Sequence, residues 1–80
     1  MAAAKSPDHE ALGRALRDLR TERGISQEEL GYQSGLHRNY VGACERGEIN
    51  LSFRVLLRLT RALDIRLSDL AGRYEQALSA

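Results

Sequence analysis

A serine, a glutamine and two glutamates at residues 26–29, followed by a glycine at position 35, leave room for one short helix and a sharp turn. The hydroxyl of Ser26 can cap an amide of the first turn while Glu29 reaches back to the amide of the serine, as in a capping box. The carboxylates of this segment also favour the positive end of the helix dipole. Gly35 permits the left-handed backbone that a sharp turn needs. The sequence therefore predicts a helix that begins at Ser26 and ends in a turn over residues 34–36.

Similar start and stop signals divide the rest of the chain into four more helices. Serines suited to capping precede residues 7–23 and 52–64, and glycines follow residues 7–23 and 37–46. Between these signals, apolar residues recur at the spacing that buries one face of a helix. The expected helices span residues 7–23, 26–34, 37–46, 52–64 and 67–77, with a loop at 48–51. The sequence therefore predicts an all-α fold, a compact bundle of five helices.

The length of the chain allows one domain with an economical core. A chain of 80 residues buries only about 60% of the surface that it exposes when unfolded, which leaves little room for a catalytic cleft. We expect residues 1–6 to form a disordered N-terminal tail and residues 7–78 to form the domain. The sequence contains neither a nucleophile paired with a base nor a glycine loop that cradles phosphates, so it does not predict an enzyme.

No signal for export, membrane insertion, a disulfide or a metal is apparent in the sequence. The single cysteine, Cys44, cannot form an intramolecular disulfide, and no cluster of cysteine and histidine has the spacing of metal ligands. Nowhere do 18 apolar residues run together, and the N-terminal residues contain no long apolar region. We therefore expect a cytoplasmic protein with no cofactor, no metal and no membrane contact.

Positive charge is concentrated in the second half of the chain, although the formal net charge is only +1. Five arginines and two glutamates between His37 and Arg61 give that stretch a charge of +3, so the remaining residues together carry −2. A phosphate backbone attracts positive charge that is gathered in this way. The distribution of charge, more than its total, favours a nucleic acid as the partner.

A set of residues at regular spacings extends from the second expected helix to the fifth. It comprises Ser26-Gln27-Glu28-Glu29-Leu30, Gly35-Leu36, Tyr40-Val41, Glu45-Arg46-Gly47, Leu56, Leu59, Ala62-Leu63 and Leu70. This set resembles the lambda-repressor/Cro-type, or XRE-family, helix-turn-helix transcriptional regulators, and the similarity covers residues 12–70. Within it, residues 35–40 are similar to the recognition region of controller proteins of restriction-modification systems. The resemblance implies a lambda-repressor-like DNA-binding domain with its helix-turn-helix at about residues 26–46, in helices two and three.

The third helix, residues 37–46, is then the one that enters the major groove of double-stranded DNA. Arg38 and Asn39 lie at its opening, and arginine can pair with guanine and asparagine with adenine; the alternative is a solvated helix end. Ala43 can meet a thymine methyl group or serve only as a spacer. His37 can contact a base, a phosphate or neither, because histidine is a poor cap where the family usually has a hydroxyl. The expected base contacts are therefore His37, Arg38, Asn39 and Ala43.

A second group of polar residues flanks this helix, where phosphate contacts occur in the fold that the chain resembles. In that family the glutamine at the position of Gln27 touches a phosphate and steadies a side chain of the recognition helix; the alternative is an ordinary exposed residue. Tyr40 can donate its hydroxyl to a phosphate while its ring packs. The arginines among these residues can equally be solvated. The expected phosphate contacts are Gln27, Tyr40, Arg46, Asn50 and Arg54.

Three structural roles complete the expected domain. The resemblance implies an ion pair between Arg20 of the first helix and Glu45 of the third, which would hold the two helices together. Cys44 is expected to be a small core residue, with a redox sensor as the alternative. Gly31 and Gly42 stand where the family usually has alanine or a small polar residue, so each marks either a close helix contact or simple tolerance.

One recognition helix reads too few base pairs for a specific address in a genome, so such modules usually pair on near-palindromic sites. We therefore expect a homodimer, with helix five as the dimerisation element through Leu67, Tyr74, Ala77 and Leu78. Glu28 and Glu29 form an acidic face that can touch RNA polymerase and activate, although capping already explains both and repression is the simpler expectation. The alternative function is a protein-interaction module, an adaptor or an antitoxin-like domain on the same helical scaffold.

Overall fold

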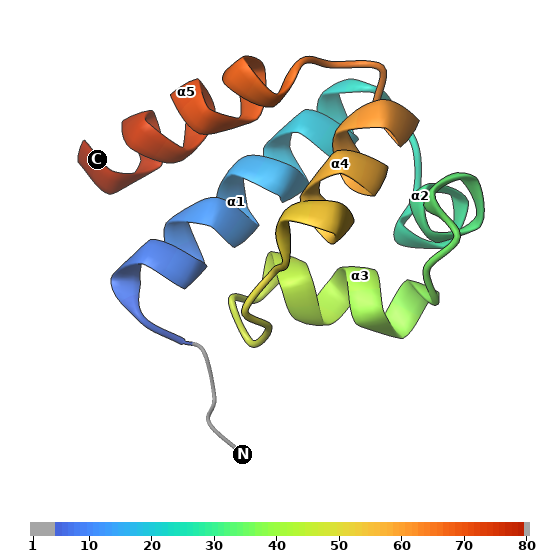
Figure 1. Ribbon diagram of the computed structural model, residues 1–80, viewed down its shortest axis with the longest axis horizontal. Helices are drawn as coiled ribbons and strands as arrows, with labels where there is room; N and C mark the ends of the chain where they lie inside the picture. The colour runs from blue at the N-terminus through green and yellow to red at the C-terminus, as the bar shows by residue number, and fades with distance from the viewer. Residues whose placement is uncertain (1–4, 80) are drawn as a thin grey trace.

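Five α-helices make up the part of the chain that the computed structural model describes, residues 5–79 (Figure 1). Each helix turns its small and aliphatic side chains toward one shared interior, so the helices bury one another's apolar faces around a single core. The prediction of an all-α, five-helix domain is confirmed. The helices are α1 (Pro7–Glu22), α2 (Gln27–Ser34), α3 (Arg38–Glu45), α4 (Phe53–Ala62) and α5 (Leu67–Ser79).

Serine caps begin three of the helices, as the sequence predicts. The hydroxyl oxygens of Ser6, Ser26 and Ser52 each accept a hydrogen bond from the backbone amide three residues further on. At α2 only the serine half of the capping box is made, the hydrogen bond from the Glu29 amide to the Ser26 hydroxyl. The Glu29 carboxylate accepts instead from the Gln33 side chain, with an Nε2 to Oε2 distance of 2.6 Å. One turn of helix brings residues i and i+4 together, so the glutamine competes successfully for this carboxylate.

Several helix boundaries differ from the sequence prediction by one or two residues; α4, for example, ends at Ala62, two residues before the predicted end. Helix α5 continues to Ser79, two residues beyond the predicted end. The predicted tail of residues 1–6 overlaps the described domain, because Ser6 caps α1 and the amide of Lys5 donates to the carbonyl of Gly47 over 2.7 Å. The described domain thus begins at Lys5, and residues 1–4 of the predicted tail lie outside the described residues.

The core lies between α1 and the other four helices. Helix α5 packs mainly along α1, α3 packs on both α1 and α2, and α4 packs on α2 and α5. In Figure 1, α3 and α5 lie at opposite sides of the molecule, with α1 and α4 between them. The dimensions of 28 × 27 × 20 Å fit one compact domain. The buried apolar residues are Ala11, Ala15, Leu16, Leu19, Leu30, Val41, Cys44, Leu59, Leu63 and Leu70.

Cys44 contributes to this core from the inner face of α3, with 2% of its surface exposed. Burial, and to a smaller extent the nearby Glu45 carboxylate, raises the pKa of its thiol to about 12. Because the thiolate is the reactive form of cysteine, a thiol with so high a pKa is inert at neutral pH. The structure therefore favours the packing role for Cys44 over the redox role. Among residues 5–79, no helix combines the length and apolar character that a membrane crossing requires.

Candidate nucleic-acid interface

A tight turn joins α2 to α3 and sets the direction in which α3 leaves the molecule. Gly35 caps the end of α2 with φ of 76°, a left-handed conformation that other residues adopt only at a cost. Gly31 lies against this turn: a Cβ atom at that position would stand 2.5 Å from the carbonyl oxygen of Leu36 and 3.2 Å from the amide of Arg38. Of the two explanations for Gly31, the structure supports close contact.

The three residues that open α3 are all exposed to solvent. His37 is the N-cap of the helix, and its Nδ1 accepts a hydrogen bond from the amide of Asn39 over 3.0 Å. Histidine is a poor cap in general, yet here its ring nitrogen takes the place of the usual hydroxyl. The side chains of Arg38 and Asn39 follow directly on the exposed end of the helix, and Ala43 lies half-buried one turn further along.

Arg38 has one acidic neighbour. The distance between its Nη1 and Glu28 Oε2 of α2 is 3.7 Å, with 61% of the arginine side chain and 75% of the glutamate side chain exposed. Ion pairs with such exposure contribute little to stability. Arg38 is therefore able to leave Glu28 for another partner. The pairing also brings Glu28 beside the start of α3, whereas the sequence analysis assigned it to a separate acidic face.

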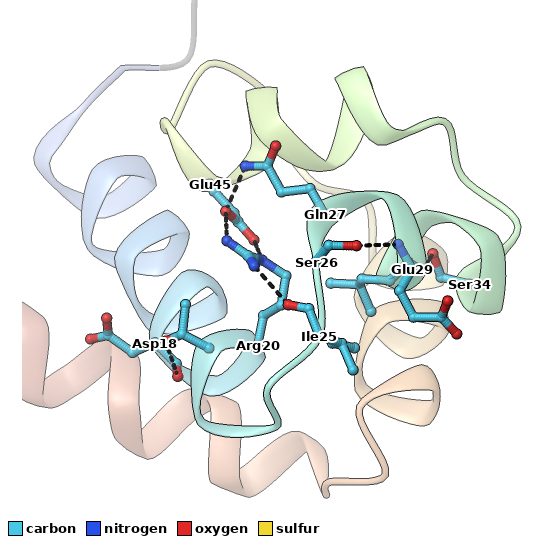
Figure 2. Close-up of polar contacts among 10 residues, drawn as sticks. Asp18, Arg20, Ile25, Ser26, Gln27, Glu29, Ser34 and Glu45 are labelled. Carbon is cyan, nitrogen blue, oxygen red and sulfur yellow. Dashed lines mark hydrogen bonds and ion pairs between the residues drawn. The ribbon is translucent and has the colours of Figure 1, made fainter.

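A buried ion pair holds α3 to α1 (Figure 2). Arg20 Nε donates to Glu45 Oε2 over 2.6 Å, and Arg20 Nη2 donates to Glu45 Oε1 over 3.1 Å. Only 11% of the arginine side chain and 4% of the glutamate side chain are exposed. Arg20 Nη1 also donates to the carbonyl of Ile25 over 2.8 Å, so the pair secures the link between α1 and α2 as well. Arg20 and Glu45, the ion pair that the family resemblance implies, are thus in contact.

Gln27 connects the same ion pair to α2. Its Nε2 donates to Glu45 Oε1 over 2.9 Å, and Figure 2 shows its amide crossing from α2 to α3. Glu45 thereby joins side chains from α1 and α2 to α3. Hydrogen bonds to an ionised carboxylate are among the stronger ones in proteins. Gln27 therefore ties α2 to α3 through the Glu45 carboxylate.

The other residues expected to contact phosphate surround α3 in different ways. Tyr40 is half-buried, and this burial is the largest cause that raises the pKa of its hydroxyl. The Oδ1 of Asn50 lies 3.2 Å from Nε2 of His9 in α1. Arg54 is exposed in the first turn of α4. Arg46 is exposed at the end of α3, but it is engaged by an acidic residue that the sequence analysis did not assign to the site.

That acidic residue is Glu48. Its carboxylate accepts from two nitrogens of Arg46: Nε to Oε2 is 3.0 Å and Nη2 to Oε1 is 3.2 Å. The hydrogen bond is the largest cause that lowers the pKa of Glu48 and raises that of Arg46. The guanidinium also passes over Gly42, where a Cβ atom would stand 3.1 Å from Arg46 Nη1 and 3.3 Å from Gln27 Oε1. The two-residue spacing of Arg46 and Glu48 was the available signal in the sequence, but it does not define an orientation.

The expected dimer residues divide into two groups. Tyr74 and Ala77 are half-buried where α5 meets α1: the Tyr74 hydroxyl donates to Asp8 over 2.9 Å, and Arg14 Nη2 donates to the Ala77 carbonyl over 3.4 Å. Leu67 and Leu78 remain 38% and 44% exposed. Phe53, which begins α4 and is 65% exposed, is a further exposed apolar side chain that was not among the expected dimer residues. Its position directly after a capping serine was the available signal.

Comparison with known proteins agrees with this geometry. A family model described as a helix-turn-helix domain matches residues 11–76. The control protein C.SmaI from Serratia marcescens is 39% identical over 64 residues, which are 80% of this chain and 76% of that protein. The crystal structure of the restriction-modification controller protein C.AhdI from Aeromonas hydrophila is 48% identical, with a TM-score of 0.80 over 81% of this chain and 98% of that one.

A further structure supports the fold alone. The controller protein C.Esp1396I, solved as a tetramer in complex with its natural 35 base-pair operator, is 24% identical, with a TM-score of 0.88 over 95% of this chain and 100% of that chain.

The fold and these matches define a class of protein, the helix-turn-helix DNA-binding regulators of transcription, and this chain belongs to that family. Within the family it closely resembles the controller proteins of restriction-modification systems. The prediction of a regulator instead of an enzyme is confirmed, since these relatives are control and controller proteins.

Proposed function

We propose that this protein binds a near-palindromic operator in double-stranded DNA as a homodimer and reads bases through residues 37–46. One observation carries the proposal: His37, Arg38 and Asn39 project from the exposed start of α3, a helix that the buried pair of Arg20 and Glu45 holds to α1. Because the start of a recognition helix contacts base edges in this class of protein, these side chains are suited to the major groove.

The contacts follow from the chemistry of each side chain. Arg38 gives up its weak pairing with Glu28 and donates to guanine, while Asn39 pairs with adenine. His37 acts first as the cap of α3, and its exposed ring lies close enough to the same end of the helix to meet the DNA. Ala43 meets a thymine methyl group. Contacts to phosphate come from Gln27, Tyr40, Asn50 and Arg54, and they position the helix without reading sequence.

Dimerisation uses exposed apolar residues of α5, with Leu67 at its start and Leu78 near its end. Leu67 and Leu78 supply apolar surface that residues 5–79 leave uncovered, and the half-buried Tyr74 and Ala77 extend it toward α1. The same fold occurs as a tetramer on operator DNA in C.Esp1396I, so it is compatible with assembly on DNA. Two copies related by a two-fold axis would place their α3 helices on matching half-sites of a near-palindrome.

Any contact with RNA polymerase would come from Glu29 more readily than from Glu28. Glu28 lies against Arg38 at the DNA-binding end of α3, whereas Glu29 bonds to Gln33 on an exposed part of α2. Repression by occupying the operator needs no such contact and is the simpler mode of action.

Binding to DNA can be tested by selecting fragments from random double-stranded DNA and measuring affinity for the selected site at several salt concentrations. We expect affinity to fall steeply with added salt and to be lost selectively in Arg38→Ala. Arg61→Ala, which removes an exposed arginine of α4, is the matched control for loss of charge. If the protein selects no sequence and its interactions do not respond to salt, it is a protein-interaction module and the proposal is wrong.

The dimer can be tested separately by sedimentation. Leu67→Asp and Leu78→Asp alter exposed residues, so they are expected to produce a folded monomer. Phe53→Ser, on α4, is the comparison variant. If only Phe53→Ser yields the monomer, the dimer interface lies at α4, and the assignment to α5 is wrong.

A further inference from the structure

We propose that Arg46 reads a guanine in each half-site and that Glu48 is the residue that positions it for this task. The proposal rests on the proposed binding of operator DNA and changes the expected role of Arg46 from a phosphate contact to a base contact. Three features of the structure support it: the edge of the guanidinium that Glu48 occupies, the space above Gly42, and the net charge of the pair.

The hydrogen bonds to Glu48 leave free the edge of the Arg46 guanidinium that matches a guanine. A guanidinium carries five N–H groups, one on Nε and two on each Nη. Glu48 accepts from Nε and from Nη2, so it uses the side edge of the group. The end edge keeps one N–H of Nη2 and both of Nη1. Two parallel N–H groups match the O6 and N7 acceptors of guanine, which lie side by side in the major groove.

Gly42, a buried residue of α3, leaves space for this free edge beside the helix. Gly42 lies four residues after Arg38 and four before Arg46, so the three positions share one face of the helix. The Arg46 side chain runs back along that face until Nη1 lies 3.1 Å from where a Cβ of Gly42 would be. Although Arg46 only caps the end of α3, its guanidinium thus lies one turn nearer to the start of the helix, where base contacts occur.

Gln27 closes the other side of the same space. Its amide oxygen and nitrogen would stand 3.3 and 3.5 Å from a Cβ at position 42, and the nitrogen is bonded to Glu45. The guanidinium of Arg46, held by Glu48, and the anchored amide of Gln27 therefore both border the space over Gly42. Of the two explanations for Gly42, close contact is the one that the structure supports, and the contact is with side chains of the interface.

The charge of the pair argues against a phosphate as the partner of Arg46. Arg46 and Glu48 together carry no net charge, and a carboxylate within 3.2 Å of the guanidinium would repel a phosphate that approached it. A guanine edge is neutral and offers two acceptors, so the carboxylate does not oppose that contact. Arg54, in contrast, has no ion pair among residues 5–79 and keeps its role as a phosphate contact.

The experiment compares the wild type, Arg46→Ala and Glu48→Gln on the DNA site that the wild type selects from random sequences. Each base pair of a half-site is replaced in turn, and affinity is measured by fluorescence anisotropy. We expect Arg46→Ala to lose about 5- to 150-fold on the selected site and to accept any base at one position that the wild type reads as guanine. Discrimination at the positions read by Arg38 and Asn39 should persist.

A chemical change in the DNA tests the same contact from the other side. Replacing that guanine by 7-deazaguanine removes the N7 acceptor, which should weaken binding by the wild type and leave Arg46→Ala unaffected. Glu48→Gln frees the guanidinium, so we expect weaker discrimination at this position together with tighter binding to unrelated DNA, because a negative charge has been removed from the interface.

Gly42→Ala provides a third variant, since a methyl group would displace the guanidinium from its place over α3. It should reduce discrimination at the same base pair, and a urea unfolding curve checks that the variant is folded. Gly72→Ala in α5, where a Cβ would meet nothing within 4 Å, is the matched control and should bind as the wild type does.

Uniform weakening would overturn the proposal. If Arg46→Ala binds every sequence less tightly by the same factor and the salt slope falls by about one, Arg46 contacts a phosphate. The proposed operator binding would still stand in that case. If the wild type selects no DNA site at all, the proposed function fails first, and this inference fails with it.

Discussion

The two ends of α3 each carry an arginine paired with a glutamate, but the pairs differ in geometry. At the start of the helix, Arg38 and Glu28 are 3.7 Å apart through one pair of atoms, and both side chains are largely exposed. At the end of the helix, Arg46 and Glu48 share two hydrogen bonds of 3.0 and 3.2 Å. Although the two arginine side chains are similarly exposed, at 61% and 58%, Arg46 is therefore oriented by its partner more closely than Arg38 is.

This difference separates two ways of using a positive charge at a DNA interface. A mobile arginine adapts to its site but loses side-chain entropy when it binds. An arginine that is already oriented loses less entropy, and it accepts only a partner of matching geometry. The proposed recognition helix, α3, combines the two, with the more mobile arginine first and the more oriented one last.

The largest effect is expected when Glu45, which bonds α3 to side chains of α1 and α2, loses its charge. Glu45→Gln would leave the Arg20 charge buried without its partner, so we expect a loss of about 3–5 kcal/mol in the free energy of unfolding. Urea unfolding followed by circular dichroism measures this loss. Glu75→Gln, which changes an exposed glutamate of α5, is the control. An equal effect of the two substitutions would contradict the structural role of Glu45.

A smaller loss is expected from damage to the turn that leads into the start of α3. Gly31→Ala places a methyl group 2.5 Å from the Leu36 carbonyl oxygen, and relief of such overpacking typically costs about 1–3 kcal/mol. Gly72→Ala, which meets no neighbour, should instead stabilise the protein by up to about 1 kcal/mol through helix propensity. Thermal unfolding of both variants distinguishes them. Stabilisation by Gly31→Ala would show that the turn yields more readily than its geometry indicates.

Loss of the His37 cap is expected to weaken the start of α3 and to leave its end intact. His37→Ala removes the acceptor for the Asn39 amide, and we expect a loss of about 1 kcal/mol in the free energy of unfolding. His37→Ser supplies a hydroxyl in its place and should restore this loss. The pair also tests the histidine ring as a DNA contact: if His37→Ser recovers stability but not operator affinity, the ring has a second role.

The smallest effect is expected at the weak ion pair. Glu28→Gln removes an exposed partner of Arg38, so operator affinity should change by less than about fivefold, with the preferred bases unchanged. Its counterpart at the other end, Glu48→Gln, should alter base preference. Affinity measurements on the selected site and on its single-base variants compare the two. If both substitutions change base preference alike, the contrast between the two ends is wrong.

Sequence reasoning predicted the helices well because their boundaries depend on local chemistry. Ser6, Ser26 and Ser52 cap the helices that they were expected to cap, and Gly35 adopts the left-handed turn. These interactions join residues within four positions of one another, so they can be identified without knowledge of the fold. The half-formed capping box shows the limit, because Glu29 had two local partners and the sequence does not rank them.

For the candidate site, sequence reasoning named residues but not how their side chains are arranged. The exposed start of α3 follows from helix periodicity, and the pairing of Arg20 with Glu45 followed from the family resemblance. The contact of Arg46 with Glu48 depends on side-chain rotamers and on a space that Gln27 bounds from another helix. The burial of Tyr74 depends on how α5 crosses α1. Such long-range and rotameric details are not encoded in the spacing of residues.

The position of Cys44 gives the molecule a built-in reporter of its own opening. The thiol belongs to the helix that we propose meets DNA, yet it faces the core, and its pKa near 12 keeps it unreactive while the helix is in place. A disulfide reagent therefore labels the protein only when α3 separates from the interior. The labelling rate would then measure how often α3 detaches from the core, and how far a bound operator suppresses that motion.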